Sequence, residues 1–195
     1  MNKQRLEAFS DGVIAIIITI MVLEMKVPHG TDWIALRPLI PVVLSYALSF
    51  VFLGIYWCNH HHLFQAVRHV NGQVLWANLH LLFWLSLIPF VTSWMGENHF
   101  VAGPVAMYGV VMLLAGCAYF ILTRVLLAVH GAESPLATAL GSDRKGKLSV
   151  VLYAVAIPLA FQIPWLACAV YVLVAAIWLI PDRRIERVLA GAPGE

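Results

Sequence analysis

The chain has 195 residues, of which 62% are hydrophobic and only 11% are charged. Soluble domains are typically about 45–50% apolar and about 25% charged, so this composition excludes an ordinary soluble domain. The mean hydropathy of +0.86 is too high for one signal segment to explain. With about 20 residues per spanning helix, the length gives room for about six helices. The sequence therefore predicts an all-α integral membrane protein.

The net charge and the cysteines exclude several other classes. A formal net charge of +2 is too small to indicate nucleic-acid binding. Cys58, Cys117 and Cys168 are far apart and lie in or beside apolar runs, so we expect buried small side chains and no disulfide framework. The segment 1–10 is polar and no cleavage site follows the first apolar run, so we expect the first helix to remain in the mature protein.

Six apolar stretches predict six transmembrane helices in a single domain over residues 1–195. The first run is short for a bilayer core of about 30 Å, so we begin its helix near Gln4. The last apolar region, residues 148–181, is too long for one helix, and Gln162 with Pro164 favours a break within it. The expected spans are residues 4–27, 39–58, 74–95, 104–122, 148–161 and 164–180.

Basic residues are distributed unevenly between the two sides that this topology defines. With six spans, both termini lie on one side together with the second and fourth loops. The opposite side has only Lys26 and Arg37. The positive-inside rule then predicts that both termini are cytoplasmic. The basic residues on that side are Lys3, Arg5, Arg68, Arg124, Arg144, Lys145, Lys147, Arg183, Arg184 and Arg187.

The first helix has two different faces. At about 100° per residue, one line along it forms an apolar stripe, whereas Ser10 and Asp11 point about 120–140° away from that stripe. Polar groups within apolar spans are costly, so each is a candidate for function. The stripe consists of Arg5, Phe9, Gly12, Ile16, Ile20, Leu23 and Val27, with Thr19 at its edge.

Motifs on the first three helices carry a family resemblance. The first helix reads Arg5-x-x-x-Phe9-Ser10-Asp11-Gly12, followed by Ala15-Ile16, Thr19-Ile20 and Leu23-Glu24. Later runs read Trp57-x-x-His60-His61-x-Leu63-Phe64 and Leu85-Ser86-Leu87-Ile88-Pro89-Phe90. These motifs closely resemble the endosomal and lysosomal potassium-channel family, in its short bacterial six-helix form. The resemblance covers nearly the whole chain.

The resemblance implies a homotetramer in which the first helix of each subunit lines a central potassium-permeable pore. The family lacks the Thr-Val-Gly-Tyr-Gly filter, and no such loop occurs in this sequence. Apolar rings constrict the pore in family members, and their positions here are Ile16, Ile20 and Leu23, with Thr19 adding a hydroxyl ring. The plainer interpretation, in which these residues pack against lipid or in the core, is less favoured because of the resemblance.

The physics of an apolar ring limits what such a pore can do. A narrow ring of isoleucines offers a cation no ligands and blocks by dewetting, so conduction requires the ring to widen. We expect modest selectivity for potassium over sodium, because potassium releases its water more cheaply. A single stripe cannot enclose a pore, so an oligomer of closed cyclic symmetry is required.

The Ser10 and Asp11 pair has two interpretations. Its angle away from the stripe favours a hydrogen-bond network that locks the first helix to its neighbours over a cation site at the pore mouth. Asn78 and His80 lie at a comparable depth in the third span and are the candidate partners. Arg5 could line the pore mouth or bridge to an adjacent subunit.

Two further groups of ionisable residues have plainer interpretations. Adjacent histidines in the run 60–62 point apart on a helix, so we expect interfacial hydrogen bonding and a cytoplasmic pH response instead of a metal site. Glu24 and Lys26 are expected to form a solvated pair at the outer end of the first helix, with cation attraction to the outer mouth as the alternative.

These observations predict a potassium channel of the bacterial plasma membrane that needs no cofactor and is not an enzyme. Its expected partners are copies of itself, potassium ions and the lipid bilayer. The alternative is a small proton- or cation-coupled secondary transporter that uses Asp11 and His80 as a relay. Such transporters usually show paired repeats with broken helices, and neither is visible in the sequence. A third interpretation is an intramembrane metalloenzyme built on the histidine run.

Overall fold

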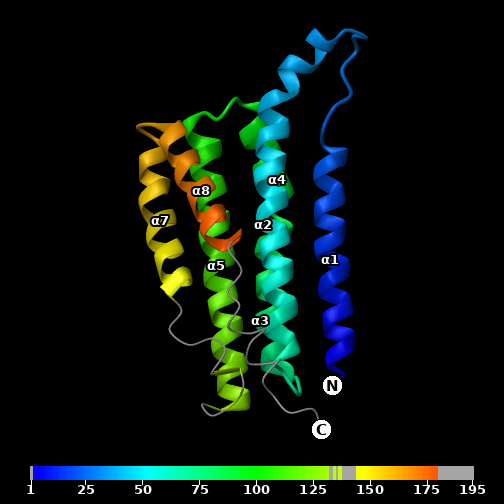
Figure 1. The fold of residues 1–195 in the computed structure, drawn as a ribbon, viewed down its shortest axis with the longest axis vertical. Helices are drawn as coiled ribbons and strands as arrows, with labels where there is room; N and C mark the ends of the chain where they lie inside the picture. Colours follow the sequence, from blue (N-terminus) through cyan, green and yellow to red (C-terminus); the bar gives the residue numbers. More distant parts are fainter. Residues whose placement is uncertain (1, 132–133, 135, 138–143, 180–195) are drawn as a thin grey trace.

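The computed structural model describes residues 2–131, 134, 136–137 and 144–179 (Figure 1). These residues form an all-α structure, as expected. In chain order the elements are α1 (Lys3–Leu23), the 3-10 helix η1 (Trp33–Leu39), α2 (Ile40–Gln65), α3 (Gly72–Ser86), α4 (Ile88–Glu97), α5 (Ala102–His130), α7 (Arg144–Ala160) and α8 (Pro164–Leu179).

Four helical segments among the described residues are long and apolar enough to cross a membrane. They are Lys3–Leu23, Trp33–Gln65, Gly72–Glu97 and Ala102–His130, and α8 is a shorter apolar helix. The turn between α7 and α8 lies where Gln162 and Pro164 were expected to break the last apolar region. The end of the expected last span at residue 180, and the basic residues after it, lie outside the described residues.

Several helix ends differ from those expected. α1 begins at Lys3, where Asn2 accepts a hydrogen bond from the Gln4 amide at 2.9 Å, and it ends at Leu23 instead of residue 27. Pro28 disfavours helical backbone at Val27, so the helix could not have reached its expected end.

α2 and α5 continue well past the expected ends at residues 58 and 122. The expected ends were placed near polar residues, Asn59 in α2 and Arg124 in α5. A polar side chain does not by itself end a helix. α5 stops only at Gly131, whose φ of 82° lies in the region that favours glycine. The expected loop over residues 124–147 therefore starts as helix.

The third apolar stretch is not one straight helix over 74–95, because α3 and α4 meet at Leu87. Pro89 has no amide hydrogen to donate to the Leu85 carbonyl, and its ring clashes with that carbonyl, so the helix must bend there. The bend leaves α4 packed against both α2 and α5. Ser49 of α2 hydrogen bonds with Thr92 of α4 at 2.7 Å and with Tyr108 of α5 at 3.1 Å.

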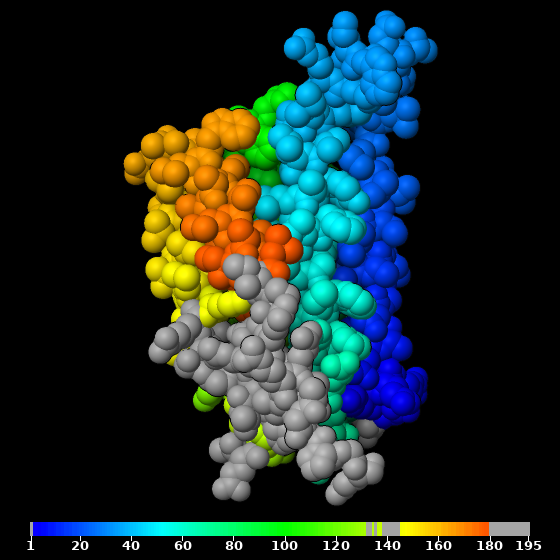
Figure 2. Space-filling model, in the orientation of Figure 1, coloured from blue at the N-terminus to red at the C-terminus, as the bar shows by residue number. Residues whose placement is uncertain are grey.

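The helices are arranged so that α1 lies at one edge of the molecule and α7 and α8 lie at the opposite edge (Figure 1). α1 packs against α2, α3 and α4, whereas α7 packs against α5 and α8. In the space-filling view α1, in blue, extends along the right-hand edge beside α2 (Figure 2). One full-length side of α1 is therefore left uncovered by the rest of the subunit.

Candidate pore-lining helix and its anchoring network

The predicted stripe of α1 is the side that the subunit leaves uncovered. Ile16 is 58% exposed and Leu23 is 81% exposed, and Arg5, Phe9, Gly12 and Ile20 are exposed as well. Val27, the last residue of the predicted stripe, is also exposed but lies beyond the end of α1. The opposite face packs against the neighbouring helices through Leu6, Ser10, Ile14, Ile17 and Met21, all of which are buried. An exposed apolar stripe this long, on a helix held firmly along its other side, marks a surface for contact outside the subunit.

Thr19 lies at the edge of the stripe with its hydroxyl only partly used. Its Oγ1 donates to the Ile16 carbonyl at 2.9 Å, one turn earlier in α1. A threonine hydroxyl has one donor and two acceptor lone pairs, so this bond leaves the oxygen free to accept. Thr19 is exposed and can present that oxygen to a cation or to water.

A buried chain of hydrogen bonds joins α1 to α3 and α2 through Ser10. The Asn78 side-chain amide donates to Ser10 Oγ at 2.9 Å, and Ser10 Oγ donates to the Leu6 carbonyl at 2.9 Å. Asn78 Oδ1 lies 2.8 Å from His60 Nε2. Because Oδ1 can only accept, His60 must carry its proton on Nε2 and donate to Asn78. Ser10, Asn78 and His60 are all buried, so each depends on these partners.

Asp11 anchors the same part of α1 to α2. Trp57 Nε1 donates to Asp11 Oδ1 at 3.0 Å. The consecutive residues Ser10 and Asp11 therefore hold different neighbours, because adjacent side chains on a helix point about 100° apart. Together the two bonds fix the rotation of α1 about its own axis, and this rotation keeps the stripe facing outward.

His80 does not join this network, contrary to the sequence-based expectation. It is exposed, and its Nε2 accepts a hydrogen bond from Trp84 Nε1 at 2.9 Å, one turn along α3. Positions 78 and 80 are about 200° apart around a helix, so only one of them can face α1. That residue is Asn78.

The histidine that does join the network, His60, was not among the expected partners. The spacing Trp57-x-x-His60 places both side chains on one side of α2, and this was the signal that could have identified it. His61 is exposed and hydrogen bonds with Gln65 at 2.8 Å, so the adjacent histidines point apart. The described residues contain no group of three or more side chains that could hold a metal ion.

Both ends of α1 are tied to the rest of the subunit. Near its start, Lys3 Nζ donates to the Val67 carbonyl at 2.9 Å. Beyond its end, Lys26 pairs with Glu97 at the end of α4, at 3.1 Å between Nζ and Oε1. The expected partner of Lys26 was Glu24, but the chain turns after Leu23 and brings Lys26 to α4 instead.

Comparison with known proteins identifies relatives that are similar to this chain in sequence. A family model described as endosomal/lysosomal potassium channel TMEM175 matches residues 5–89. A potassium channel of Chryseobacterium sp. (strain P1-3) is 54% identical over 189 residues, covering 97% of this chain and 98% of that protein. The endosomal/lysosomal proton channel TMEM175 of Homo sapiens is 39% identical over 80 residues, covering 35% of this chain and 16% of that protein.

A solved structure is similar over nearly the full length of the chain. The crystal structure of a lysosomal potassium-selective channel TMEM175 homolog from Chamaesiphon minutus matches with a TM-score of 0.78 and 27% identity, covering 92% of this chain and 97% of that chain. The residues that the family model matches include the α1 stripe and every member of the hydrogen-bond network. Because the family is one of ion channels, the metalloenzyme interpretation is dropped. This chain is a multi-pass membrane protein that belongs to the TMEM175 family.

Proposed function

We propose that this protein is a potassium-permeable ion channel in which α1 of each subunit lines a central pore. The observation that carries the proposal is the uncovered stripe on a helix whose opposite face is fixed by buried hydrogen bonds. The relatives described as potassium channels support the choice of ion. Four subunits arranged around one axis bring four stripes together, so that each stripe position forms a ring.

The proposed constriction consists of rings of Ile16, Ile20 and Leu23. On a helix these rings lie about 6 Å and about 4.5 Å apart, so together they form a narrow apolar segment about 10 Å long. Such a segment excludes water when it is narrow, and it conducts when the rings widen enough for a partly hydrated ion. Thr19 is proposed to supply oxygens between the first two rings, where its hydroxyl can accept from water around the ion.

The anchoring network holds α1 by the side that faces away from the proposed pore axis. Ser10, Asp11, Asn78 and Trp57 hold α1 against α2 and α3 near the end where the chain begins. A small rotation of α1 would move every ring off the axis, so the network is proposed to set the orientation of the rings. Arg5 and Phe9 continue the stripe toward the same end and are proposed to line the pore mouth.

The proposed setting is the bacterial plasma membrane, with six spans and both termini in the cytoplasm. The uneven distribution of basic residues supports this orientation. The alternative of a proton- or cation-coupled transporter relied on a relay between Asp11 and His80. Asp11 is bound by Trp57, and His80 accepts from Trp84, so neither residue is directed at the other. No observation favours the transporter.

Flux through purified protein in liposomes tests the proposal. Potassium loaded inside the vesicles is expected to leave down its gradient with no partner ion, faster than sodium under the same gradient. The oligomer mass, measured on the same sample, is expected to be that of four subunits. Uptake that depends on a proton gradient would instead support a transporter, and a monodisperse monomer that conducts would contradict a shared pore.

A further inference from the structure

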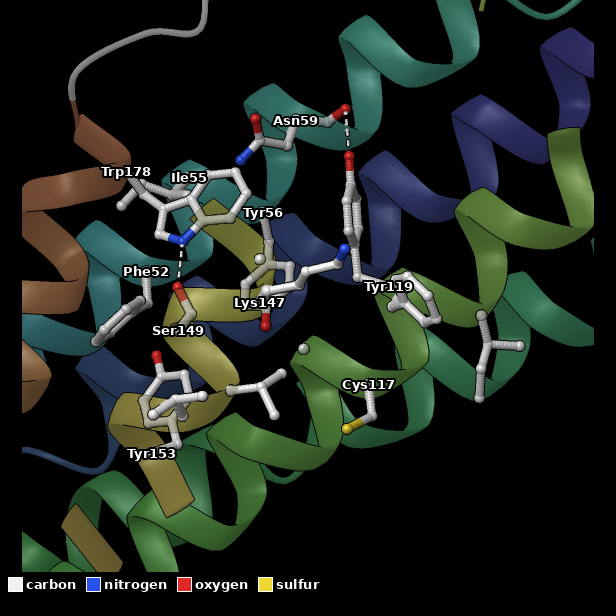
Figure 3. Close-up of a pocket in the computed structure, with 16 residues that line it drawn as sticks. Phe52, Ile55, Tyr56, Asn59, Cys117, Tyr119, Lys147, Ser149, Tyr153 and Trp178 are labelled. Carbon is white, nitrogen blue, oxygen red and sulfur yellow. Dashed lines mark hydrogen bonds between the residues drawn. The ribbon is translucent and has the colours of Figure 1, made fainter. Parts of the chain in front are cut away.

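The structure has a cavity that no residue of α1 lines and to which the proposed pore gives no role. It has a volume of about 630 Å³ and lies among α2, α5, α7 and α8 (Figure 3). This volume is within the range of about 300–1,000 Å³ that is usual for sites that bind organic molecules. α7 and α8 form the edge of the subunit opposite α1 (Figure 1), so in the proposed tetramer the cavity is directed away from the axis.

The rim of the cavity is apolar and exposed. Phe120 and Ile121 of α5 lie on one side, and Val150 and Val151 of α7 lie on the other, all of them exposed. In a chain that spans a membrane, an exposed apolar rim at the outer edge faces hydrocarbon and not water. A lipid acyl chain can therefore enter the cavity from the side without leaving the bilayer.

The inside of the cavity combines apolar walls with a few polar groups. Phe52 and Ile55 of α2 line the wall. Tyr56 and Tyr153 also line the cavity, and among the described residues neither of their hydroxyls has a hydrogen-bond partner. Pockets that bind amphiphilic molecules commonly have this composition, with a few polar groups that orient the ligand.

A lysine contributes positive charge to the lining of the cavity. Lys147 is exposed and lines the cavity near the start of α7, and Figure 3 shows its side chain extending across the cavity. None of the described residues that line the cavity is acidic. A lysine beside an apolar cavity keeps its stem on apolar surface and its charged end near the membrane interface, where it attracts anionic headgroups.

Three other polar side chains near the cavity, those of Trp178, Ser149 and Tyr119, already have partners within the protein. Trp178 Nε1 donates to Ser149 Oγ at 2.8 Å, and Ser149 Oγ donates to the Lys145 carbonyl at 2.9 Å. The Tyr119 hydroxyl donates to the Asn59 carbonyl at 3.3 Å. These bonds, two of which are drawn in Figure 3, hold α8 on α7 and α5 on α2, and thus form a rigid frame around the space.

We propose that this cavity binds an anionic phospholipid of the surrounding membrane, with an acyl chain inside and the headgroup at Lys147. The assignment of the occupant rests in part on the proposed function, because a pore at α1 leaves this edge to lipid and not to another subunit. An amphiphile with a negative headgroup matches these features. Its acyl chain fits the apolar rim, and its polar part fits the unpartnered tyrosine hydroxyls and the one lysine among the described lining residues.

Gly116 allows the cavity to be filled without disturbing the helices. It lies on α5 and lines the cavity, and a Cβ added there would meet only the Tyr56 hydroxyl, at 3.9 Å. Gly116→Leu therefore places a side chain in the space that the acyl chain would use. Gly103→Leu is the matched control, because Gly103 lies on the same helix, is exposed, and has no atom within 4 Å of an added Cβ.

The test is lipid binding to the purified full-length oligomer, measured by native mass spectrometry with phosphatidylglycerol or phosphatidylcholine of identical acyl chains. One lysine near the headgroup predicts about a fivefold preference of the wild-type protein for phosphatidylglycerol. Gly116→Leu is expected to lose the tightly bound lipid, whereas Gly103→Leu is expected to keep it. Lys147→Gln is expected to lose the fivefold preference, and Lys147→Arg is expected to retain it.

Two results would overturn the proposal. One is a Gly116→Leu oligomer that elutes like the wild-type protein and binds both lipids as the wild-type protein does. The other is an undiminished preference for phosphatidylglycerol in Lys147→Gln, an exposed position at which the fold is not at risk. Both measurements are independent of ion flux, so a failure of the lipid site and a failure of the proposed pore can be distinguished.

Discussion

The two faces of α1 are built for different purposes. One face holds buried groups such as Ser10 and Ile14, and a hydrogen-bonded chain joins it to two other helices. The other face, with Ile16 and Leu23, is apolar and uncovered in the subunit. Substitutions on the first face should therefore change the stability of the subunit, and substitutions on the second should change only what happens outside it.

Asn78→Leu should produce the largest loss of stability. It removes the central member of the chain, so that the buried His60 loses its acceptor and Ser10 keeps only its bond to the Leu6 carbonyl. Each buried group left without a partner costs about 1–3 kcal/mol. We expect a clear fall in the midpoint of denaturant or thermal unfolding in detergent. His80→Ala, two positions away but exposed, is the matched control and should stay within about 0.5 kcal/mol of the wild-type protein.

Asp11→Ala should cost less than Asn78→Leu, because the Asp11 carboxylate is only half-buried and water can replace part of the lost bond with Trp57. A hydrogen bond to a charged group contributes about 1.5–3 kcal/mol when it is fully protected, so we expect a loss toward the lower end of that range. The yield of the oligomer and its unfolding midpoint should both fall. A normal oligomer with altered conductance would mean that Asp11 acts at the pore and not as an anchor.

Lys26→Gln should have a smaller effect on stability than either of these. The Lys26 and Glu97 side chains are 82% and 46% exposed, so water and salt screen their attraction. Exposed ion pairs contribute about 0–1 kcal/mol. The difference in unfolding midpoint between the wild-type protein and Lys26→Gln should shrink further in high salt. A difference that is large and independent of salt would show that the pair is shielded in the assembled protein.

The directions in which the side chains of α1 face could be predicted from the sequence, because they depend only on helical periodicity. The stripe and the off-stripe angle of Ser10 and Asp11 follow from helix geometry alone, and both have the orientation expected. The partners could not be predicted in the same way, because two candidates at similar depth on α3 differ only in the direction they face. Choosing Asn78 over His80 requires the rotation of α3 relative to α1, which depends on packing along both helices.

The limits of the helices were hard to predict from hydropathy. Hydropathy marks where apolar residues stop, but α2 and α5 continue through polar residues until the backbone itself changes, as it does at Gly131. Pro89 was visible in the sequence, yet whether a proline bends a helix or ends it depends on the packing around it. Here the helix resumes as α4 because Ile88, Val91 and Met95 are buried against the neighbouring helices.

Ile16→Asn should have the smallest effect on subunit stability and the clearest effect on permeation. Ile16 is 58% exposed in the subunit, so the substitution removes little buried apolar contact. In a ring around the axis, however, four amides would replace an apolar surface, wet the constriction and give sodium and potassium similar passage. The ratio of potassium to sodium flux in liposomes should fall toward one. Val155→Asn is the matched control, because Val155 is 56% exposed but lies on α7, at the opposite edge of the subunit. An unchanged flux ratio in Ile16→Asn would contradict the assignment of Ile16 to the constriction, and equal changes in both variants would mean that the two edges of the molecule do not differ in function.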